Sequence, residues 1–220
     1  MNVNRLIDHT LLNPDATEQQ IINLCKEAIQ YNFKSVCVNP SWVKIASKEL
    51  LGSAIEVCTV VGFPLGANKT EVKLYETAAA IQDGATEIDM VLNIAQLKQG
   101  NVEYVKKEIN AVVEASQGKL VKVIIETALL LPSEIELASK VISESNAKFV
   151  KTSTGFSKSG AKLEDVKIIK AAIDEHTEIK ASGGIKSIDQ LIQFYDEGVT
   201  RIGTSNGIAI VEGQKVSAGY

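Results

Sequence analysis

The sequence is poor in the residues that nucleic-acid-binding proteins carry. Only 5% of its 220 residues are aromatic, and its 23 basic and 27 acidic residues are interspersed, giving a net charge of −4. A protein that binds nucleic acid usually presents a basic stripe, together with aromatic side chains on which bases can stack. We therefore expect no nucleic-acid partner for this chain.

Metal ligands, disulfide partners and long apolar runs are scarce as well. The cysteines Cys25, Cys37 and Cys58 and the two histidines have spacings that form neither a zinc motif nor a disulfide framework. No run of about eighteen apolar residues is present, and the first residues lack the apolar region of a signal peptide. We expect no metal, no cofactor and no membrane partner, and a reducing, cytoplasmic compartment.

What the sequence does contain is a regular alternation of short apolar runs and helical patterns. Eight strands are expected, over residues 6–10, 35–39, 56–62, 87–93, 119–127, 149–154, 178–182 and 201–204. Helical periodicity is expected over residues 15–29, 69–83, 102–115, 132–145, 163–176 and 187–197, with short helices beginning at Pro40 and Asn206. Such alternation is typical of an α/β protein with a parallel sheet.

The number of strand–helix units favours a closed sheet. Eight units in about 200 residues fit a (β/α)8 TIM barrel. No change in composition marks a linker, so we expect one domain over residues 1–220, with a short flexible tail at about 213–220. The alternative is a doubly wound open sheet, which usually carries a glycine fingerprint after its first strand; this chain has none there.

The expected strands separate into an apolar face and a mixed face. Successive side chains of a strand point to opposite sides, and in a barrel the apolar faces pack on the surrounding helices. The mixed faces then converge on the barrel axis, where they bring together Asp8, Cys37, Asp89, Glu126, Lys151 and Lys180. Because the strands are parallel, their carboxyl ends share the mouth where barrel enzymes carry out their chemistry.

Two of these residues, Lys151 and Lys180, lie 29 positions apart, about one strand–helix–strand unit, and each precedes small residues and glycine. On neighbouring strands their ammonium groups would approach to about 6 Å, where repulsion is on the order of 3 kcal/mol. Repulsion and burial both lower a lysine pKa, and a deprotonated lysine forms a Schiff base with a carbonyl. Asp89 could relay the protons.

Each of these residues also has an ordinary structural explanation. A lysine in a strand is usually a solvated residue at an end or an edge, and Asp89 alone could be a structural hydrogen-bond partner. Cys37 could be a small buried hydrophobe, and Glu126 could simply pair with an interior lysine.

The loops after the seventh and eighth expected strands offer a phosphate site. Gly183 and Gly184 follow the seventh strand, and Ser205 and Asn206 follow the eighth at the start of a short helix. Glycines let backbone amides approach an anion, and barrels usually bind phosphate at these two loops. A glycine pair can also serve only to turn the chain.

These motifs resemble those of the deoxyribose-phosphate aldolase family over nearly the whole chain, from Asp8 onward. The similarity is carried by Asp8-His9-Thr10-Leu11-Leu12, Val36-Cys37-Val38-Asn39-Pro40, Glu87-Ile88-Asp89-Met90-Val91-Leu92-Asn93, Phe149-Val150-Lys151-Thr152-Ser153-Thr154-Gly155, Lys180-Ala181-Ser182-Gly183-Gly184-Ile185 and Arg201-Ile202-Gly203-Thr204-Ser205. The resemblance implies a class I aldolase that needs no metal. It implies reversible cleavage of 2-deoxy-D-ribose 5-phosphate into acetaldehyde and D-glyceraldehyde 3-phosphate.

The resemblance also implies roles for individual residues. Lys151 matches the Schiff-base lysine, Lys180 the second lysine that lowers its pKa, and Asp89 the proton-relay acid. The residues that match the substrate-binding set are Asp8, Cys37, Thr154, Gly155, Gly183, Gly184, Ser205 and Asn206. Tyr220 matches a C-terminal tyrosine associated with proton transfer in the family, although composition alone indicates a frayed terminus there.

Two positions depart from patterns found in some members of the family. Phe156 stands where those members have a lysine directly after the glycine of the first lysine motif, and Asn206 stands where they have a second serine. Two other functions fit the sequence: a different Schiff-base aldolase such as a transaldolase, or a barrel that binds a sugar phosphate without turnover. We expect a phosphosugar substrate, and a homodimer or higher homo-oligomer is compatible with the sequence.

Overall fold

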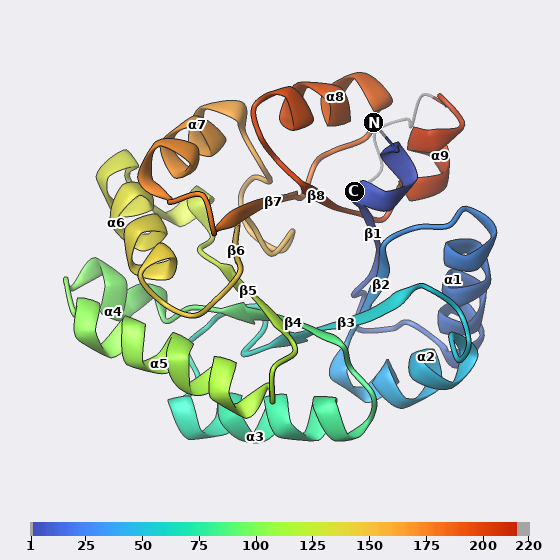
Figure 1. Ribbon diagram of the computed structural model, residues 1–220, viewed down its shortest axis with the longest axis horizontal. Coiled ribbons are helices and arrows are strands. Elements are labelled where there is room, and N and C mark those ends of the chain that lie inside the picture. The colour runs from blue at the N-terminus through green and yellow to red at the C-terminus, as the bar shows by residue number, and fades with distance from the viewer. Residues whose placement is uncertain (1, 215–220) are drawn as a thin grey trace.

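The eight expected strands form one closed parallel barrel. The structure is a computed structural model that describes residues 2–214. Each strand pairs with the next along the chain, and β8 pairs with β1 to close the sheet. Viewed down the axis, helices surround the barrel on every side (Figure 1). The predicted (β/α)8 fold is confirmed.

The strands lie close to the predicted positions, and five of them, β2 to β6, end earlier than predicted. Their bounds are β1 (Ile7–Leu11), β2 (Ser35–Val38), β3 (Glu56–Val61), β4 (Glu87–Val91), β5 (Leu120–Ile124), β6 (Phe149–Lys151), β7 (Glu178–Ser182) and β8 (Arg201–Thr204). β5 was expected to run to residue 127 and β6 to residue 154. β5 ends earlier because Glu126 has a left-handed backbone with φ of 54°, which cannot continue a strand.

The helices follow the predicted alternation with two differences. Their bounds are α1 (Glu18–Gln30), α2 (Val43–Glu49), α3 (Thr70–Gln82), α4 (Ile94–Lys98), α5 (Val102–Ala115), α6 (Pro132–Ser143), α7 (Leu163–Ala172), α8 (Ile188–Asp196) and α9 (Gly207–Val211). Single 3₁₀ turns cover Val3–Leu6, Pro40–Trp42 and Thr127–Leu129. The short helix α4 was not predicted, and α7 ends before residue 176. Asp174 caps the turn after α7 by accepting from the backbone N–H groups of His176 and Thr177.

Local sequence signals explain where several helices begin. Thr17 and Gln20 form a reciprocal capping box at the start of α1. Pro132 occupies the first turn of α6, where its missing N–H would have had no intrahelical partner. Asn93 and Ser187 accept hydrogen bonds from the first turns of α4 and α8. No helix among the described residues combines the length and apolar character needed to cross a bilayer.

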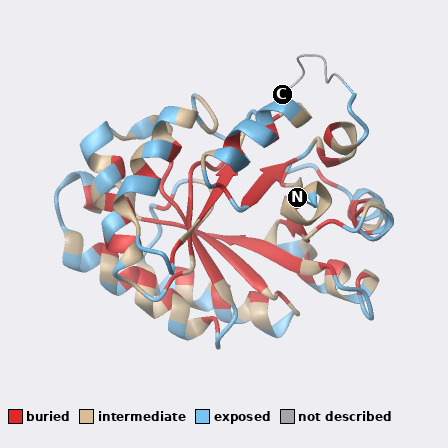
Figure 2. Ribbon diagram, turned by 45° about the horizontal axis from the view of Figure 1, so that its top comes forward, coloured by how far each residue is buried: buried red, intermediate tan, exposed pale blue. Residues whose placement is uncertain are grey.

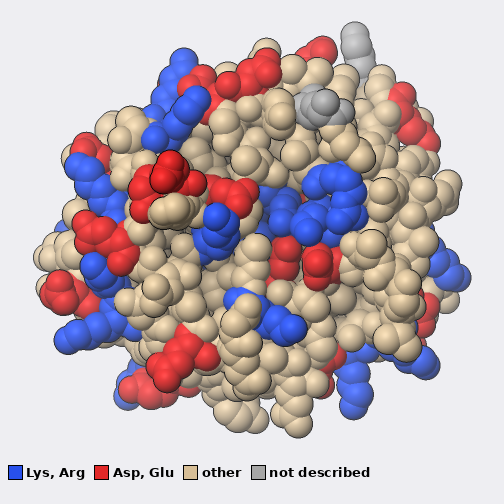
Figure 3. Space-filling model, viewed as in Figure 1, with Lys and Arg blue, Asp and Glu red and all other residues tan. Residues whose placement is uncertain are grey.

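The main core lies between the sheet and the helices. Outward side chains such as Val36, Ile88, Val150 and Ile202 are buried with the apolar faces of the helices in one large cluster. Figure 2 shows the buried strands meeting at the centre and exposed residues on the outer sides of the helices. On the face seen in Figure 3, a small group of basic side chains lies near the centre with acidic ones beside it. The two signs are mingled over that face rather than separated.

The barrel interior is divided into two kinds of surface. One sector is apolar and consists of Leu12, Cys37, Cys58 and Val60, packed against Phe63. The remainder of the interior contains a buried network of charged side chains from β1 and from β4 to β8. The inward faces predicted from residue alternation are therefore confirmed.

A second buried ion pair lies outside the barrel, between α3 and α5. Lys73 Nζ lies 2.9 Å from Glu108 Oε2, and both side chains are fully buried. Lys73 also donates to the carbonyl oxygen of Val91 at 2.8 Å, while Glu108 accepts from the backbone N–H of Asn93 at 3.1 Å. The pair thus connects two helices to the carboxyl end of β4, two residues from Asp89.

We expect Glu108→Gln to destabilise the fold, because it leaves the buried ammonium group of Lys73 without a charge partner. The free energy of unfolding in urea should fall by about 3 kcal/mol. Glu136→Gln is the matched control, since Glu136 pairs with Lys140 across an exposed turn of α6; it should change stability by less than about 0.5 kcal/mol. Equal effects of the two substitutions would contradict this account of the pair.

Candidate active site

The two lysines identified in the sequence lie side by side. In the register of the barrel, Lys151 on β6 is the direct partner of Lys180 on β7. Their Nζ atoms each donate to the same oxygen, Oδ2 of Asp89 on β4, at 2.7 Å. The sequence prediction that these three residues converge is confirmed.

The other oxygen of Asp89 has two further partners. Lys122 Nζ on β5 donates to Asp89 Oδ1 at 2.9 Å, and the thiol of Cys58 on β3 donates to it at 3.2 Å. Asp89 is fully buried, so a single carboxylate is shared by three ammonium groups and one thiol. These four donors provide the hydrogen bonds that the carboxylate oxygens of Asp89 need, without water.

Two more carboxylates complete the network. Asp8 Oδ2 on β1 lies 2.5 Å from Lys180 Nζ, and Asp8 Oδ1 accepts from Arg201 on β8 at 2.8 Å. Glu87 accepts from Arg201 and from Lys122, at 2.8 Å and 2.6 Å. The charged residues of the network therefore come from six strands, β1 and β4 to β8.

The charges in this network outweigh the cost of burying them. Burial alone raises the pKa of Asp89, but Lys122, Lys151 and Lys180 hold that pKa well below its ordinary value. Burial lowers the pKa of Lys180, but Asp8 and Asp89 more than compensate and raise it. The pKa of Lys122 is raised in the same way, with Asp89 as the main partner. Lys122 and Lys180 are therefore permanent cations at neutral pH.

Lys151 differs from the other two lysines in its carboxylate partners. Lys180 contacts Asp8 and Asp89, and Lys122 contacts Glu87 and Asp89. Within the described residues, Lys151 pairs with Asp89 alone, at the last position of β6. Lys151 therefore has one carboxylate ion-pair partner, whereas Lys122 and Lys180 each have at least two.

A glycine makes room for the neighbouring lysine. A Cβ added to Gly203 on β8 would lie 3.1 Å from Cε of Lys180 and 3.0 Å from Cβ of Ser182. These separations are tighter than ordinary contacts, so a larger residue would require Lys180 or Ser182 to shift by a few tenths of an ångström. The glycine of the Arg201-Ile202-Gly203 motif thus has a steric role in the charged network.

The sequence analysis did not identify four members of the network: Cys58, Glu87, Lys122 and Arg201. Glu87 and Lys122 lie on the mixed faces that residue alternation gives, so a stricter use of that signal would have found them. Arg201 opens its strand and resembles an ordinary edge residue. Cys58 is the register partner of Cys37 in the pairing of β2 with β3, which spacing in the sequence does not reveal.

Glu126 is not part of the charged network. Its side chain accepts hydrogen bonds from the hydroxyl and the backbone N–H of Thr154, the latter at 3.2 Å. Burial raises the pKa of Glu126, although the hydrogen bonds from Thr154 act in the opposite direction. No ion pair joins Glu126 to a lysine among the described residues, although Lys151 lies close enough to lower the pKa of Glu126 against the effect of burial. Because its backbone turns out of the strand, the carboxylate instead holds the loop after β6, which includes Thr154 and Gly155.

The loops after β7 and β8 are joined, as a shared phosphate site would require. Thr204 donates to the carbonyl oxygen of Ile185 at 3.0 Å and accepts from the backbone N–H of Asn206 at 3.0 Å. Gly183 and Gly184 both have positive φ, 83° and 78°, which favours glycine at these positions. Ser205 is exposed at this end of the barrel.

An aromatic contact connects two loops at the same end of the barrel. Phe156, after β6, meets Phe63, after β3, edge to face with ring centroids 5.4 Å apart. Phe156 therefore continues the apolar sector of the interior at the position where some aldolases of the family have a lysine. Tyr220 lies outside the described residues.

Comparison with known proteins agrees with this geometry. Residues 3–212 match the sequence model of the DeoC/LacD family aldolases. The chain belongs to this family. Deoxyribose-phosphate aldolase from Streptococcus gordonii is 53% identical over 220 residues, all of both chains, and the one from Clostridium botulinum (strain Langeland) is 54% identical over 211 residues, 96% of this chain and all of the relative.

A solved structure of this aldolase family has the same fold. The tetrameric deoxyribose phosphate aldolase from Aeropyrum pernix is 32% identical, with a TM-score of 0.89 over 96% of this chain and 89% of that one. The charged network described above is therefore the candidate aldolase centre.

We expect Asp8→Asn to destabilise the protein in a manner that depends on pH. The pKa of Asp8 lies below its ordinary value of 3.8, because Lys180, Arg201 and Lys122 outweigh the effect of burial. Its stabilisation is complete well above pH 3.8 and is lost progressively as the pH falls below that value. The loss of about 3 kcal/mol expected at pH 6 should shrink by about 1 kcal/mol at pH 3.

Urea unfolding of wild type and variant at several pH values measures this difference. Asp196→Asn is the control, since Asp196 is exposed at the end of α8 and forms no ion pair within residues 2–214. A difference between wild type and Asp8→Asn that stays constant from pH 6 to pH 3 would show that Asp8 is not held ionised by its neighbours.

Proposed function

We propose that this protein is a class I deoxyribose-phosphate aldolase. It would reversibly cleave 2-deoxy-D-ribose 5-phosphate into acetaldehyde and D-glyceraldehyde 3-phosphate. The observation that carries the proposal is the contact of two buried lysines, Lys151 and Lys180, with the same carboxylate oxygen. The family and the two bacterial relatives named as deoxyribose-phosphate aldolases support it.

In the proposed mechanism Lys151 is the nucleophile. Its free amine adds to the C1 aldehyde of the open-chain sugar, and loss of water gives a protonated imine. The imine draws electrons as the C2–C3 bond breaks and the C3 hydroxyl loses its proton, which releases D-glyceraldehyde 3-phosphate. The remaining enamine takes a proton at C2, and water then releases acetaldehyde and restores Lys151.

Asp89 is the proposed proton relay. Its Oδ2 lies 2.7 Å from Lys151 Nζ, close enough to exchange protons as the carbinolamine forms and loses water. A protonated imine places a positive nitrogen where the ammonium group stood, so the contact with Asp89 is kept through the reaction. The preorganised carboxylate therefore needs no rearrangement to stabilise the intermediate.

Lys180 is proposed to favour the free amine of Lys151. It lies beside Lys151 in the register, and its own charge is fixed by Asp8 and Asp89. A fixed neighbouring cation raises the cost of protonating the nucleophile. Lys122 is equally buried and charged, and it adds to the positive potential around Lys151. It lies on β5 as the register partner of Asp89.

The roles of the other site residues identified from the sequence are also proposals. Asp8, Cys37, Thr154 and Gly155 would line the substrate pocket, and Gly183, Gly184, Ser205 and Asn206 would hold the phosphate. Tyr220 would return a proton to C2 of the enamine, a step for which exchange of acetaldehyde methyl protons with deuterated water in Tyr220→Phe is the direct measurement. Unchanged exchange would exclude that role.

We also propose a homo-oligomer in a cytoplasmic compartment. The relative from Aeropyrum pernix is a tetramer, and this chain exposes apolar side chains such as Val72 and Tyr75 on α3, the latter with 79% exposure. All three cysteines are free thiols, which suits a reducing compartment. The mass in solution, measured by light scattering, would reject the oligomer if it corresponded to one chain.

Borohydride trapping should place the covalent adduct on Lys151. With deoxyribose 5-phosphate or acetaldehyde, reduction should fix the imine, and peptide mapping should find the added mass on the peptide that contains Lys151. Lys151→Ala should lose the adduct and lower turnover by at least about 10³-fold. Product analysis of the wild-type reaction separates this aldolase from a transaldolase.

The exposed lysine Lys140 provides the control, because Lys140→Ala should leave trapping and turnover unchanged. An adduct on Lys180 in the wild type would reverse the assignment of the two lysines. The absence of any adduct, with intact binding of substrate, would identify a sugar-phosphate-binding barrel instead of an aldolase.

Ser205→Glu should weaken recognition of the phosphate. A negative charge beside the phosphate should raise KM for deoxyribose 5-phosphate by at least about tenfold, since 1.4 kcal/mol of repulsion corresponds to that factor. KM for unphosphorylated deoxyribose should change little. Ser205→Gln has a similar size without the charge and should have a small effect on both substrates; equal effects of Ser205→Glu on both would place the phosphate elsewhere.

A further inference from the structure

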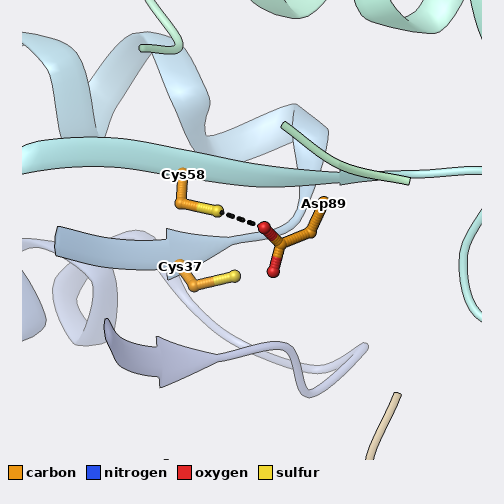
Figure 4. A group of neighbouring side chains, drawn as sticks. All are labelled: Cys37, Cys58 and Asp89. Atoms are coloured by element: carbon orange, nitrogen blue, oxygen red, sulfur yellow. Dashed lines mark hydrogen bonds between the residues drawn. The ribbon is translucent and has the colours of Figure 1, made fainter. Parts of the chain in front are cut away.

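Two thiols and a carboxylate meet inside the barrel beside the proposed nucleophile. Cys37 and Cys58 are register partners on β2 and β3, and both are fully buried with side chains pointing inward. Their Sγ atoms and a carboxylate oxygen of Asp89 all lie within 4.8 Å of one another. Figure 4 shows both sulfur atoms directed to the side of the Asp89 carboxylate.

We propose that Cys37, Cys58 and Asp89 form an inhibitory binding site for a thiophilic divalent metal ion such as Zn²⁺ or Cd²⁺. Zinc binds thiolates at about 2.3 Å and carboxylate oxygen at about 2.1 Å, so its tetrahedral ligands are separated by about 3.6–3.8 Å. The present side chains need only small rotations to reach that geometry. They supply three ligands and leave the fourth position to water, as in open zinc sites.

The charge balance of the barrel favours the replacement of two thiol protons by a divalent ion. A divalent ion would displace the two thiol protons, giving two thiolates, one carboxylate and one ion with two positive charges. The net charge of the group stays at −1, the same as that of two thiols and one carboxylate. Binding therefore adds no charge beside Lys122, Lys151 and Lys180, the three ammonium groups that contact Asp89.

One neighbour helps to form the thiolate ligand. Lys122 Nζ lies 3.5 Å from Cys58 Sγ, where its charge partly offsets the burial that raises the pKa of this thiol. Cys25, the third cysteine, lies on α1 in the shell of the barrel and belongs to no such group of ligands among the described residues. The chain therefore contains a matched pair of positions that should bind the ion and one cysteine that should not.

Occupation of the site would inhibit the enzyme, a consequence that rests on the proposed function. The ion would compete with the lysines for Asp89 and would weaken its contact with Lys151. Any route that admits a carbonyl substrate to Lys151 also leads to Asp89, which contacts both Lys151 and Cys58. Hard ions such as Mg²⁺ prefer oxygen ligands and should not bind there.

Cadmium binding to the purified full-length chain tests the site without reference to activity. In buffer free of thiols and chelators, Cd²⁺ should produce a cadmium–thiolate charge-transfer band in the ultraviolet and release two protons per ion. Cys37→Ala and Cys58→Ala should each weaken the apparent affinity by at least about tenfold. Cys25→Ala should leave the affinity within about twofold of wild type, because Cys25 lies outside the site.

The proposed metal site would be contradicted by the absence of a thiolate band in the wild type. An undiminished band in the double variant Cys37→Ala/Cys58→Ala would contradict it as well. Loss of the band in Cys25→Ala would do the same. If a variant does not fold, the wild type still decides, since two thiolate ligands require the release of two protons per bound Cd²⁺; release of fewer than two contradicts the proposal.

Inhibition is measured separately, with each variant normalised to its own metal-free turnover. Zn²⁺ should inhibit the wild type reversibly, and a chelator should restore the activity. The half-inhibitory concentration should rise by at least about tenfold in Cys58→Ala and stay within about twofold in Cys25→Ala. Cadmium binding without inhibition would refute the inhibitory role. A protein with no aldolase activity would still show the cadmium band, so failure of the proposed function is distinguishable from failure of the site.

Discussion

One carboxylate, that of Asp89, holds the interior of this barrel together. Its two oxygens accept from Lys122, Lys151, Lys180 and Cys58, which come from four different strands. Without Asp89, three buried ammonium groups would repel one another in a region that water does not reach, at a cost of several kcal/mol. The arrangement of the three lysines and the proposed chemistry both depend on this shared acceptor.

The same network gives each lysine a different environment, although all three are almost completely buried. Lys122 and Lys180 each have a second carboxylate, supplied by Glu87 and Asp8, and this fixes their charge. Lys151 pairs only with Asp89 among the described residues, and it is the last residue of β6, at the mouth of the barrel. The distribution of carboxylates, rather than the depth of burial, therefore distinguishes the proposed nucleophile from its supporting neighbours. The apolar sector formed by Leu12, Cys37, Cys58 and Val60 borders this network, since the Cys58 thiol donates to Asp89.

Much of the fold and part of the site could be predicted from the sequence. The alternation of strands and helices gave the barrel, and the spacing of Lys151 and Lys180 placed them on neighbouring strands. The strand predicted to run through Glu126 ends at Ile124, because the backbone at Glu126 is left-handed, and its carboxylate contacts Thr154, which lies 28 residues away. Arg201 and Cys58 went unnoticed for a related reason: a residue at the start of a strand, or a thiol in an apolar run, gives no local signal of its partners.

The sequence by itself determined which residues point inward, because alternation along a strand is a local property of an extended backbone. It also determined the family resemblance, since the motifs around both lysines are contiguous in the chain. Only the tertiary structure decided that Asp89 serves three lysines, that Asp8 and Arg201 meet across 193 positions of sequence, and that Cys37 faces Cys58. These contacts depend on closure of the barrel and on the relative register of its strands, and both are set by packing between segments that are distant in the sequence.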